Sequence, residues 1–177
     1  MIDKRNKYGD TPLTLACRLG LYEKVKSLLI QGSNPNELNH NGWNPIMISS
    51  KYSYYKQTKL LIKYGANIHY RFNTGKETVL MVASKYSSYK IIKLLLKSGA
   101  DSDINIQDIH GWTALMIAAR NSCLKIVNIL LEYGANVNLG NLWGYTPVML
   151  AATRISEDLE DYKDKTLSNE FNDNYKC

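Results

Sequence analysis

The stretch GWTALMIAARNSCLKIVNILLEYGANVN (111–138) decides the fold, because most of its pattern recurs elsewhere in the chain. The segment GDTPLTLACRLGLYEKVKSLLIQGSNPN (9–36) has the same layout of glycine, threonine, small residues and paired leucines. The phrase LLIKYGANIH (60–69) returns as LLEYGANVN (130–138). Self-similarity at a fixed spacing is the sequence signature of a protein built by stacking copies of one unit.

Two series of glycines set the period of this repetition. The first series is Gly9, Gly42, Gly75, Gly111 and Gly144, at intervals of 33, 33, 36 and 33 residues. The second series is Gly32, Gly65, Gly99 and Gly134, at intervals of 33, 34 and 35 residues. The third copy is the long one. We place one extra residue after Gly75 and two more at Ser102-Asp103, both in loops, where a repeat tolerates insertion.

Each copy predicts a pair of short helices. A capping residue and a residue suited to the first turn follow each glycine of the first series. These pairs are Thr11-Pro12, Asn44-Pro45, Thr78-Val79, Thr113-Ala114 and Thr146-Pro147. Small residues inside the helix then let neighbouring helices approach closely, at Ala16-Cys17, Ser49-Ser50, Ala83-Ser84, Ala118-Ala119 and Ala151-Ala152.

A second helix follows in each of the first four copies, with one apolar stripe along it. The stripes are Val25, Leu28, Leu29; Thr58, Leu61, Ile62; Ile92, Leu95, Leu96; and Val127, Leu130, Leu131. We expect the second-series glycine to end this helix in the left-handed conformation. The loops between the two glycines predict β-turn fingers, with the first-series glycine at positive φ.

These motifs resemble ankyrin repeats, whose pattern is G-x-T-P-L-H-x-A-A followed by L-L-x-x-G-A-x-x-N. The resemblance implies an all-α solenoid of helix-turn-helix units with β-turn fingers. It covers four full copies (6–38, 39–71, 72–107, 108–140) and a partial fifth (141–165). We therefore expect a repeat array over 1–152 and a polar C-terminal cap with an acidic tail over 153–177. The family's helix-1 histidine is replaced at five positions, Thr14, Met47, Met81, Met116 and Met149, so its usual inter-repeat hydrogen bond must be missing or rerouted.

Chemistry-bearing motifs are sparse. The cysteines Cys17, Cys123 and Cys177 lack metal-ligand spacing, and Cys17 lies in an apolar helix, which favours a buried reduced thiol. His40, His69 and His110 occupy unlike positions in the fingers, so we expect no metal site. No nucleophile stands beside a plausible base. We predict a non-enzymatic protein with no cofactor. No apolar run reaches the roughly 18 residues of a membrane span, and no export signal is visible. We therefore expect no membrane partner and a cytoplasmic or nuclear location.

The candidate binding surface is a column of basic residues. One stands shortly after each small pair: Arg18, Lys51, Lys85, Arg120 and Arg154. Tyr52 and Tyr86 follow two of them, and aromatic residues stand beside the turn glycines, at Tyr8, Trp43, Trp112, Trp143 and Tyr145. The family resemblance implies that partners bind the concave face of fingers and first helices, where this set would form a cationic ladder. Aromatic residues flanked by cations are typical of interaction hot spots. The alternative is that basic and aromatic residues are simply common at these positions across the family, and that the partner binds elsewhere.

These observations predict a monomeric protein-interaction module whose partner carries an acidic segment. The alternative is nucleic acid or another polyanion, because residues 1–150 hold 18 Lys/Arg against 9 Asp/Glu. Residues 151–177 hold 4 against 7, so the tail could also screen the ladder. The Lys-rich second helices are interpreted as a solvated surface. The resemblance further implies possible roles on a host kinase or the ubiquitin machinery, and the residue usage is similar to repeats of large DNA viruses.

Overall fold

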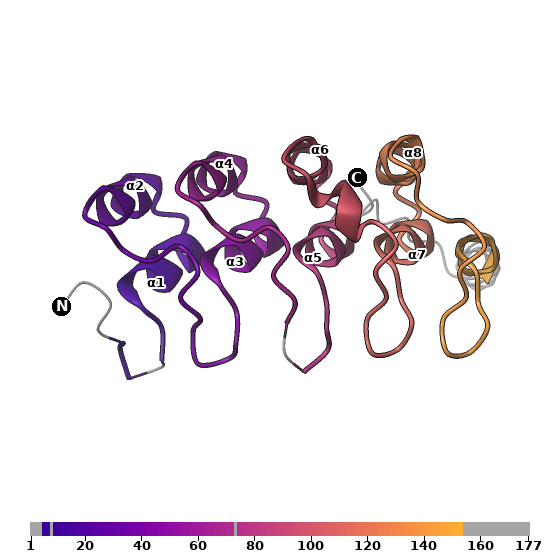
Figure 1. The fold of residues 1–177 in the computed structure, drawn as a ribbon, viewed down its shortest axis with the longest axis horizontal. Helices are drawn as coiled ribbons and strands as arrows, with labels where there is room; N and C mark the ends of the chain where they lie inside the picture. The colour runs from indigo at the N-terminus through magenta and orange to yellow at the C-terminus, as the bar shows by residue number, and fades with distance from the viewer. Residues whose placement is uncertain (1–4, 8, 73, 154–177) are drawn as a thin grey trace, which may run out of the picture.

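The computed structural model describes residues 5–7, 9–72 and 74–153 (Figure 1). Its helices are α1 (Pro12–Arg18), α2 (Tyr22–Ile30), α3 (Pro45–Lys51), α4 (Tyr55–Lys63), α5 (Val79–Lys85), α6 (Tyr89–Lys97), the 3-10 helix η1 (Ala100–Asp103), α7 (Ala114–Arg120) and α8 (Leu124–Glu132). Residues 147–153 are also helical. Within the described ranges the chain forms no sheet beyond one isolated antiparallel bridge, between Arg71 and Thr78.

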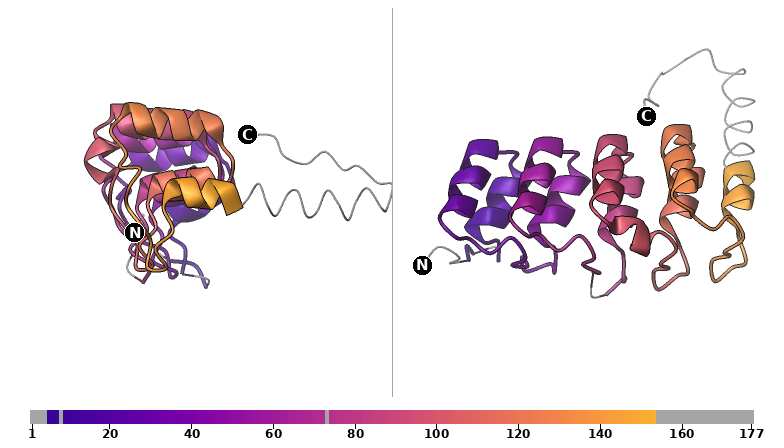
Figure 2. Two further views of the ribbon diagram at one scale, coloured as in Figure 1. Left: turned by 90° about the vertical axis from the view of Figure 1, so that its right-hand side faces the viewer. Right: turned by 45° about the horizontal axis from the view of Figure 1, so that its top comes forward.

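The helices form two rows. The first helices of the copies, α1, α3, α5 and α7, make one row, and the second helices α2, α4, α6 and α8 make a parallel row above it in Figure 1. The finger loops project from the opposite edge, and the views in Figure 2 show that the copies succeed one another along one axis. This arrangement confirms the predicted all-α repeat solenoid.

The first helices begin where the capping residues predict. The side chains of Thr11, Asn44, Thr78 and Thr113 accept hydrogen bonds from the backbone N–H three residues later, at 3.0–3.2 Å. Thr146 makes the same contact to Met149 at 3.5 Å. Each cap satisfies an N–H that the helix itself leaves unpaired. The five capping residues therefore fix the register of all five copies.

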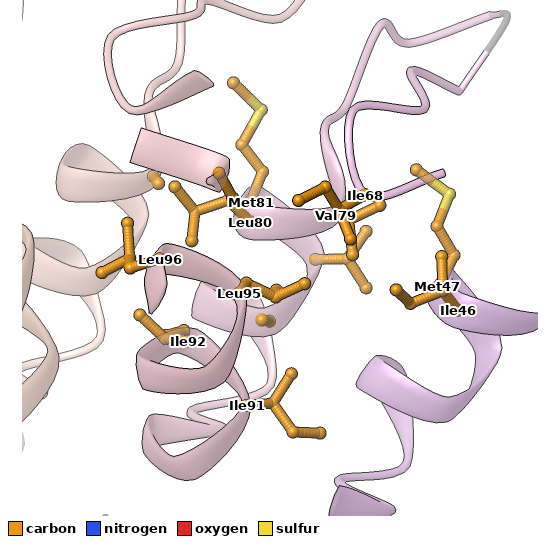
Figure 3. Close-up of a cluster of buried hydrophobic side chains, with 14 of the residues drawn as sticks. Ile46, Met47, Ile68, Val79, Leu80, Met81, Ile91, Ile92, Leu95 and Leu96 are labelled. Carbon is orange, nitrogen blue, oxygen red and sulfur yellow. The ribbon is translucent and has the colours of Figure 1, made fainter. Parts of the chain in front are cut away.

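The apolar stripes meet in one continuous core. Around the third copy, Ile46, Leu80, Met81 and Leu95 are at most 1 % exposed (Figure 3). Each unit leaves one apolar face open, and the next unit covers it, which is why the copies are stable only when stacked. The core therefore runs along the array instead of lying within separate units.

Three of the four methionines that replace the family's histidine are core residues. Met47, Met81 and Met116 are at most 1 % exposed, and the Met81 sulfur accepts the Thr78 N–H at 3.5 Å. Neighbouring copies are joined instead by finger backbones, since the N–H groups of three residues donate to carbonyls of the preceding finger at 3.0–3.1 Å. These bonds run from His40 to Gly9, from Ile109 to Gly75 and from Leu142 to His110. The finger backbones thus supply hydrogen bonds at three of the four junctions between copies.

The finger of the third copy corrects one prediction. Gly75 does not adopt positive φ; Lys76 does, at +55°, in the place that Gly42 takes in the second copy at +76°. The hydrogen bonds agree, because Lys76 N–H bonds to Phe72 C=O as Gly42 N–H bonds to Asn39 C=O. The extra residue of this finger therefore precedes Lys76. Gly75 lies one position before the place that the turn glycine takes in the other copies.

Replacing Lys76 with glycine is expected to raise the free energy of unfolding by about 0.5–1 kcal/mol, because a left-handed conformation is unfavourable for a residue with a Cβ. Chemical denaturation followed by circular dichroism measures the change. Lys59→Gly is the matched control, since Lys59 lies inside α4 and glycine in a helix interior should destabilise by about 1 kcal/mol. A destabilised Lys76→Gly protein would contradict the assignment of the turn.

The other insertion of the third copy forms η1, and it changes the contact between copies. Asn36 bonds Gly65 C=O and Asn67 N–H of the next copy, and Asn105 bonds Gly134 and Asn136 in the same way. His69 occupies this asparagine position in the second copy. Its Nδ1 lies 2.8 Å from Asp103 Oδ2, a carboxylate that η1 buries. A histidine–aspartate pair thus replaces the asparagine bridge at this junction.

Burial decreases at the last copies. Leu131 of the predicted α8 stripe is 41 % exposed, whereas its counterparts Leu29 and Leu96 are buried and Ile62 is partly buried. Met149 is 52 % exposed, although Met47, Met81 and Met116 are buried. None of the described helices is both long enough and apolar enough to cross a membrane. Apart from Thr153, the predicted cap and acidic tail (153–177) lie outside the described residues.

Candidate functional site

The predicted ladder begins as four equivalent positions. Arg18, Lys51, Lys85 and Arg120 are the last residues of α1, α3, α5 and α7. These four helices pack against one another in order, so the four cations follow each other along the row of first helices. Each cation also lies beside the finger of its own copy.

Each cation has a partner eight residues earlier, directly after the left-handed turn residue of the finger. In the first and third copies the partner is acidic: Arg18 Nη2 lies 2.7 Å from Asp10 Oδ2, and Lys85 Nζ lies 3.3 Å from Glu77 Oε1. In the second and fourth copies the partner is tryptophan. Lys51 Nζ lies 5.3 Å from the Trp43 ring centroid, and the Arg120 guanidinium carbon lies 5.5 Å from that of Trp112.

This alternation divides the ladder into two kinds of cation. The carboxylates of Asp10 and Glu77 neutralise Arg18 and Lys85 locally. Lys51 and Arg120 keep their full positive charge, because an aromatic face attracts a cation without cancelling its charge. The ladder therefore presents its net charge at the second and fourth copies.

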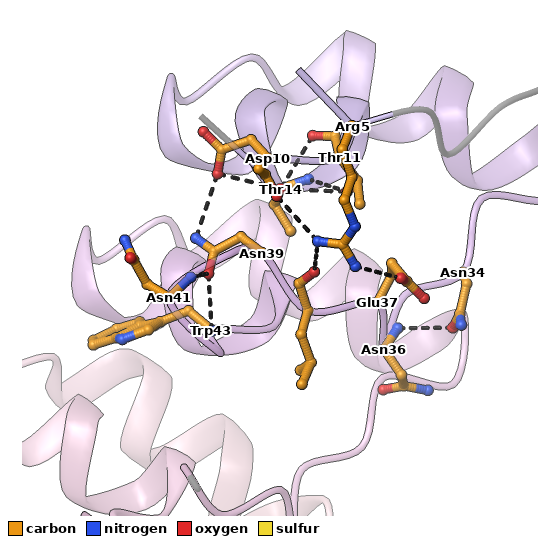
Figure 4. A network of polar contacts seen from close by, with 12 residues as sticks. Arg5, Asp10, Thr11, Thr14, Asn34, Asn36, Glu37, Asn39, Asn41 and Trp43 are labelled. Atoms are coloured by element: carbon orange, nitrogen blue, oxygen red, sulfur yellow. Dashed lines mark hydrogen bonds and ion pairs between the residues drawn. The ribbon is translucent and has the colours of Figure 1, made fainter. Parts of the chain in front are cut away.

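Asp10 is the most constrained member of the ladder. Its side chain is 6 % exposed. Its Oδ1 accepts hydrogen bonds from the Asn39 amide at 3.3 Å and from the Thr14 hydroxyl at 3.5 Å (Figure 4). Its Oδ2 accepts the hydrogen bond from Arg18. A hollow lined by Asp10, Arg18, Asn39 and Asn41 opens at this point. The network links the first two fingers, which gives Asp10 a structural role.

Lys51 stands at the centre of an aromatic cluster. Besides Trp43, its ammonium lies 5.6 Å from the ring centroids of both Tyr52 and Tyr86. Tyr52 and Tyr86 are 41 % and 38 % exposed, so the cluster is open to a partner. Phe72 supports it from behind, with its ring centroid 6.0 Å from that of Trp43. The structure thus brings together four predicted site residues from two neighbouring copies.

The fourth and fifth copies carry a second aromatic group. Trp112 is half-buried beneath Arg120. Trp143 is 62 % exposed and stacks on His110, with ring centroids 5.9 Å apart. Tyr145 is 44 % exposed and follows Gly144 in sequence, as Trp112 follows Gly111. Trp143 therefore belongs to the fingertip, whereas Tyr145 takes the position that faces the ladder in other copies.

Two predicted site residues lie outside the described residues: Tyr8 and Arg154. The register also corrects the ladder at its end. Arg18, Lys51, Lys85 and Arg120 each come seven residues after their capping residue, and the residue seven after Thr146 is Thr153. Arg154 is one position later, at the position of Leu19, Tyr52, Tyr86 and Asn121 in the earlier copies. The ladder of equivalent positions therefore has four cations.

Sequence reasoning missed two contributors, Glu77 and Phe72. Glu77 was not recognised as a partner of the ladder because it lies two residues after Gly75. In the other copies the corresponding residue directly follows the turn glycine. Phe72 takes the place of a turn-forming Asn or Asp, whose side-chain oxygen bonds the finger backbone at Asn39 and Asp108. Within the described part of the chain no three His, Cys, Asp or Glu side chains gather as a metal site would require.

Comparison with known proteins agrees with this architecture. The model of the family "Ankyrin repeats (3 copies)" matches residues 13–108 and 101–160. The chain is similar to Rabankyrin-5 of Mus musculus, 44% identical over 61 residues, which is 32% of this chain and 5% of the relative. It is also similar to Rabankyrin-5 of Homo sapiens, 54% identical over 35 residues, 20% of this chain and 3% of the relative. The chain thus spans a small fraction of these relatives' length. Both relatives are mammalian and lend no support to the predicted similarity to repeats of large DNA viruses. Because the family model matches most of its residues, the chain belongs to the ankyrin repeat family.

Proposed function

We propose that the chain is a non-enzymatic protein-interaction module that grips an acidic, aromatic-rich segment of another protein on its face of fingers and first helices. The single observation that carries this is the exposed cluster of Lys51 with Trp43, Tyr52 and Tyr86. It combines large rigid contact surfaces with an uncompensated charge, which is the composition of interface hot spots. Ankyrin repeats are generally protein-protein interaction modules, and no catalytic domain was identified in the chain.

The alternation along the ladder gives the partner a pattern. Acidic groups of the partner should meet Lys51 and Arg120, which lie two copies apart and carry uncompensated charge. Between them, Lys85 is already engaged by Glu77. A partner carboxylate placed there would meet Glu77 as well as Lys85, so neutral side chains are favoured at that point. This pattern disfavours a uniformly charged nucleic acid backbone on the same face.

Inhibition of a kinase and recruitment of a substrate to the ubiquitin machinery would both use this binding face. Each requires only that the partner be held, with no chemistry by this chain. We place this action inside the cell, on a monomeric chain, as the sequence predicts. Screening of the face by the acidic tail stays a prediction, since the tail lies outside the described residues.

Charge reversal at the two uncompensated cations is expected to abolish capture of the specific partner. In quantitative affinity capture with mass spectrometry, Lys51→Glu/Arg120→Glu should retain partners at least about 30-fold more weakly, the size of a hot-spot loss. Lys24→Glu/Lys125→Glu is the matched control, because it makes the same change in net charge on exposed residues of α2 and α8. A set of captured proteins that is the same for wild type and the Lys51→Glu/Arg120→Glu variant would rule out this face.

A further inference from the structure

The outer row of second helices carries a dense group of like charges. Lys56, Lys59 and Lys63 on α4, and Lys90, Lys93 and Lys97 on α6, are all exposed. We call these six residues the hexalysine patch. Neither helix contains an acidic residue. Within the part of the chain that the structure describes, none of the six lysines makes an ion pair.

The six lysines share one geometry. On each helix they lie three and four residues apart, which places them on one face. That face points away from the core, because Leu61 and Leu95 on the opposite side are fully buried. Seven residues of helix span about 10 Å, and packed helices lie 8–10 Å apart. Since α4 and α6 are neighbours in one row, the six lysines leave the backbone over an area about 10 Å on each side.

The array is unfavourable for folding. Lysines three and four residues apart on one helix repel each other, and Lys56 and Lys90 lie in first turns, where the helix dipole disfavours positive charge. The repeat itself does not require lysine there. In α2, Glu23 stands at the position of Lys56, and in α8, Glu132 stands at the position of Lys63. The accumulation is therefore specific to α4 and α6, and binding of a polyanion would account for it.

The chemistry of the patch favours a plane of phosphates over a nucleic acid. Every cation on the second helices is lysine, a compact point charge, whereas the arginines Arg5, Arg18, Arg71 and Arg120 lie in fingers and first helices. Bidentate recognition of nucleic acid bases and of single phosphates is best served by the planar arginine fork, although lysine also contacts both. Clusters of four to eight basic residues on a helical surface are attracted to anionic leaflets without such contacts. The close spacing of the six lysines on two neighbouring helices suits an anionic headgroup surface.

We propose that the hexalysine patch docks the protein peripherally on an anionic lipid surface, with the face of fingers and first helices left free for the protein partner. This proposal departs from the prediction that no membrane takes part, because surface attraction requires no membrane span. The docking is independent of the proposed partner binding, since the patch and the ladder lie on different rows of helices.

Co-sedimentation of the full chain with vesicles tests the proposal. The chain should sediment with vesicles of phosphatidylcholine and phosphatidylserine, and not with phosphatidylcholine alone. Binding should decrease as salt screens the charges. Lys59→Gln/Lys93→Gln, which removes the centre of both stripes, should bind about 25-fold more weakly, or about fivefold for each lysine at about 1 kcal/mol each.

The matched control is Arg71→Gln/Lys76→Gln, which removes the same charge from exposed residues of the finger loops. These loops project from the edge of the repeat array opposite the second helices. The control variant should bind vesicles within about twofold of wild type, because its charges lie beyond the Debye length of about 10 Å from the membrane. Circular dichroism should show both variants folded. Equal sedimentation with neutral and anionic vesicles would overturn the proposal, and so would an equal loss of binding in both double variants. A protein that shifts the gel mobility of a duplex oligonucleotide but does not bind vesicles would also overturn it.

Discussion

Truncating Leu96 to alanine is expected to lower the free energy of unfolding by about 3 kcal/mol, whereas the same change at Leu131 should cost less than about 1 kcal/mol. The two leucines take the same position in α6 and α8. Leu96 is 2 % exposed and Leu131 is 41 % exposed. Residue type and repeat position are therefore matched, and the covering elements differ, because α6 contacts both η1 and α8, whereas no second helix follows α8 among the described residues.

Urea denaturation of both variants, followed by helix circular dichroism, measures the difference. The dependence of stability on urea should be the same in both, since neither change alters the surface that unfolding exposes. A buried side chain truncated to alanine leaves a cavity that its neighbours fill only in part, and an exposed one leaves none. Equal costs at the two positions would mean that coverage by η1 and the next copy does not contribute to the stability of the third copy.

The fold was predictable from the sequence because its determinants are local and repeated. A threonine directly before an apolar run predicts a helix start, as Thr78 and Thr113 show. A glycine such as Gly134 ends a helix because it tolerates the left-handed conformation. Each such signal is weak alone, but five copies at one spacing leave a single consistent register. The helices, their caps and the core stripes were therefore predicted together.

The departures lie where the copies stop being equivalent. Lys76 takes positive φ although no glycine marks it, and Ser53, Ser87 and Ser122 do the same between the paired helices, where only the first copy has a glycine, Gly20. The tertiary frame imposes these turns regardless of residue preference. The His69–Asp103 pair was equally hidden, because two insertions in η1 bring together residues whose spacing matches no motif.

For the candidate site, the sequence predicts which residues take part but not which of them contact one another. The sequence identifies Arg18, Lys51, Lys85 and Arg120 as equivalent positions, but the charge on each depends on one finger residue. Asp10 and Glu77 neutralise two cations, while Trp43 and Trp112 leave the other two charged. Which finger residue reaches the end of a helix follows from the turn register, and that register became visible only in three dimensions.

Cys17 is expected to resist alkylation by at least about a thousandfold relative to the same thiol in the unfolded chain. The side chain is fully buried in α1, and burial raises the pKa of the Cys17 thiol from its ordinary 9.0 to about 12. The thiolate is the reactive form, and a pKa three units higher lowers its population about a thousandfold at pH 8. Iodoacetamide labelling, read at the Cys17 peptide by mass spectrometry, measures the protection.

The pH dependence of labelling distinguishes a shifted pKa from simple shielding. In the unfolded chain the rate should level off above about pH 9, whereas native Cys17 should gain tenfold per pH unit until about pH 12. The folded thiol keeps its proton to higher pH than the unfolded thiol. Its contribution to the free energy of unfolding is therefore constant below about pH 9 and decreases as pH rises toward 12.

Leu13→Ala provides the variant that tests how the thiol becomes reachable. Leu13 is fully buried one helical turn before Cys17, so its truncation should destabilise the first copy and speed labelling in proportion to the more frequent opening. Each copy of a stacked array contacts only its neighbours, so the first copy can open without unfolding of the whole array. Native Cys17 that reacts as fast as the unfolded thiol would instead mean that α1 is not packed against α2 and α3.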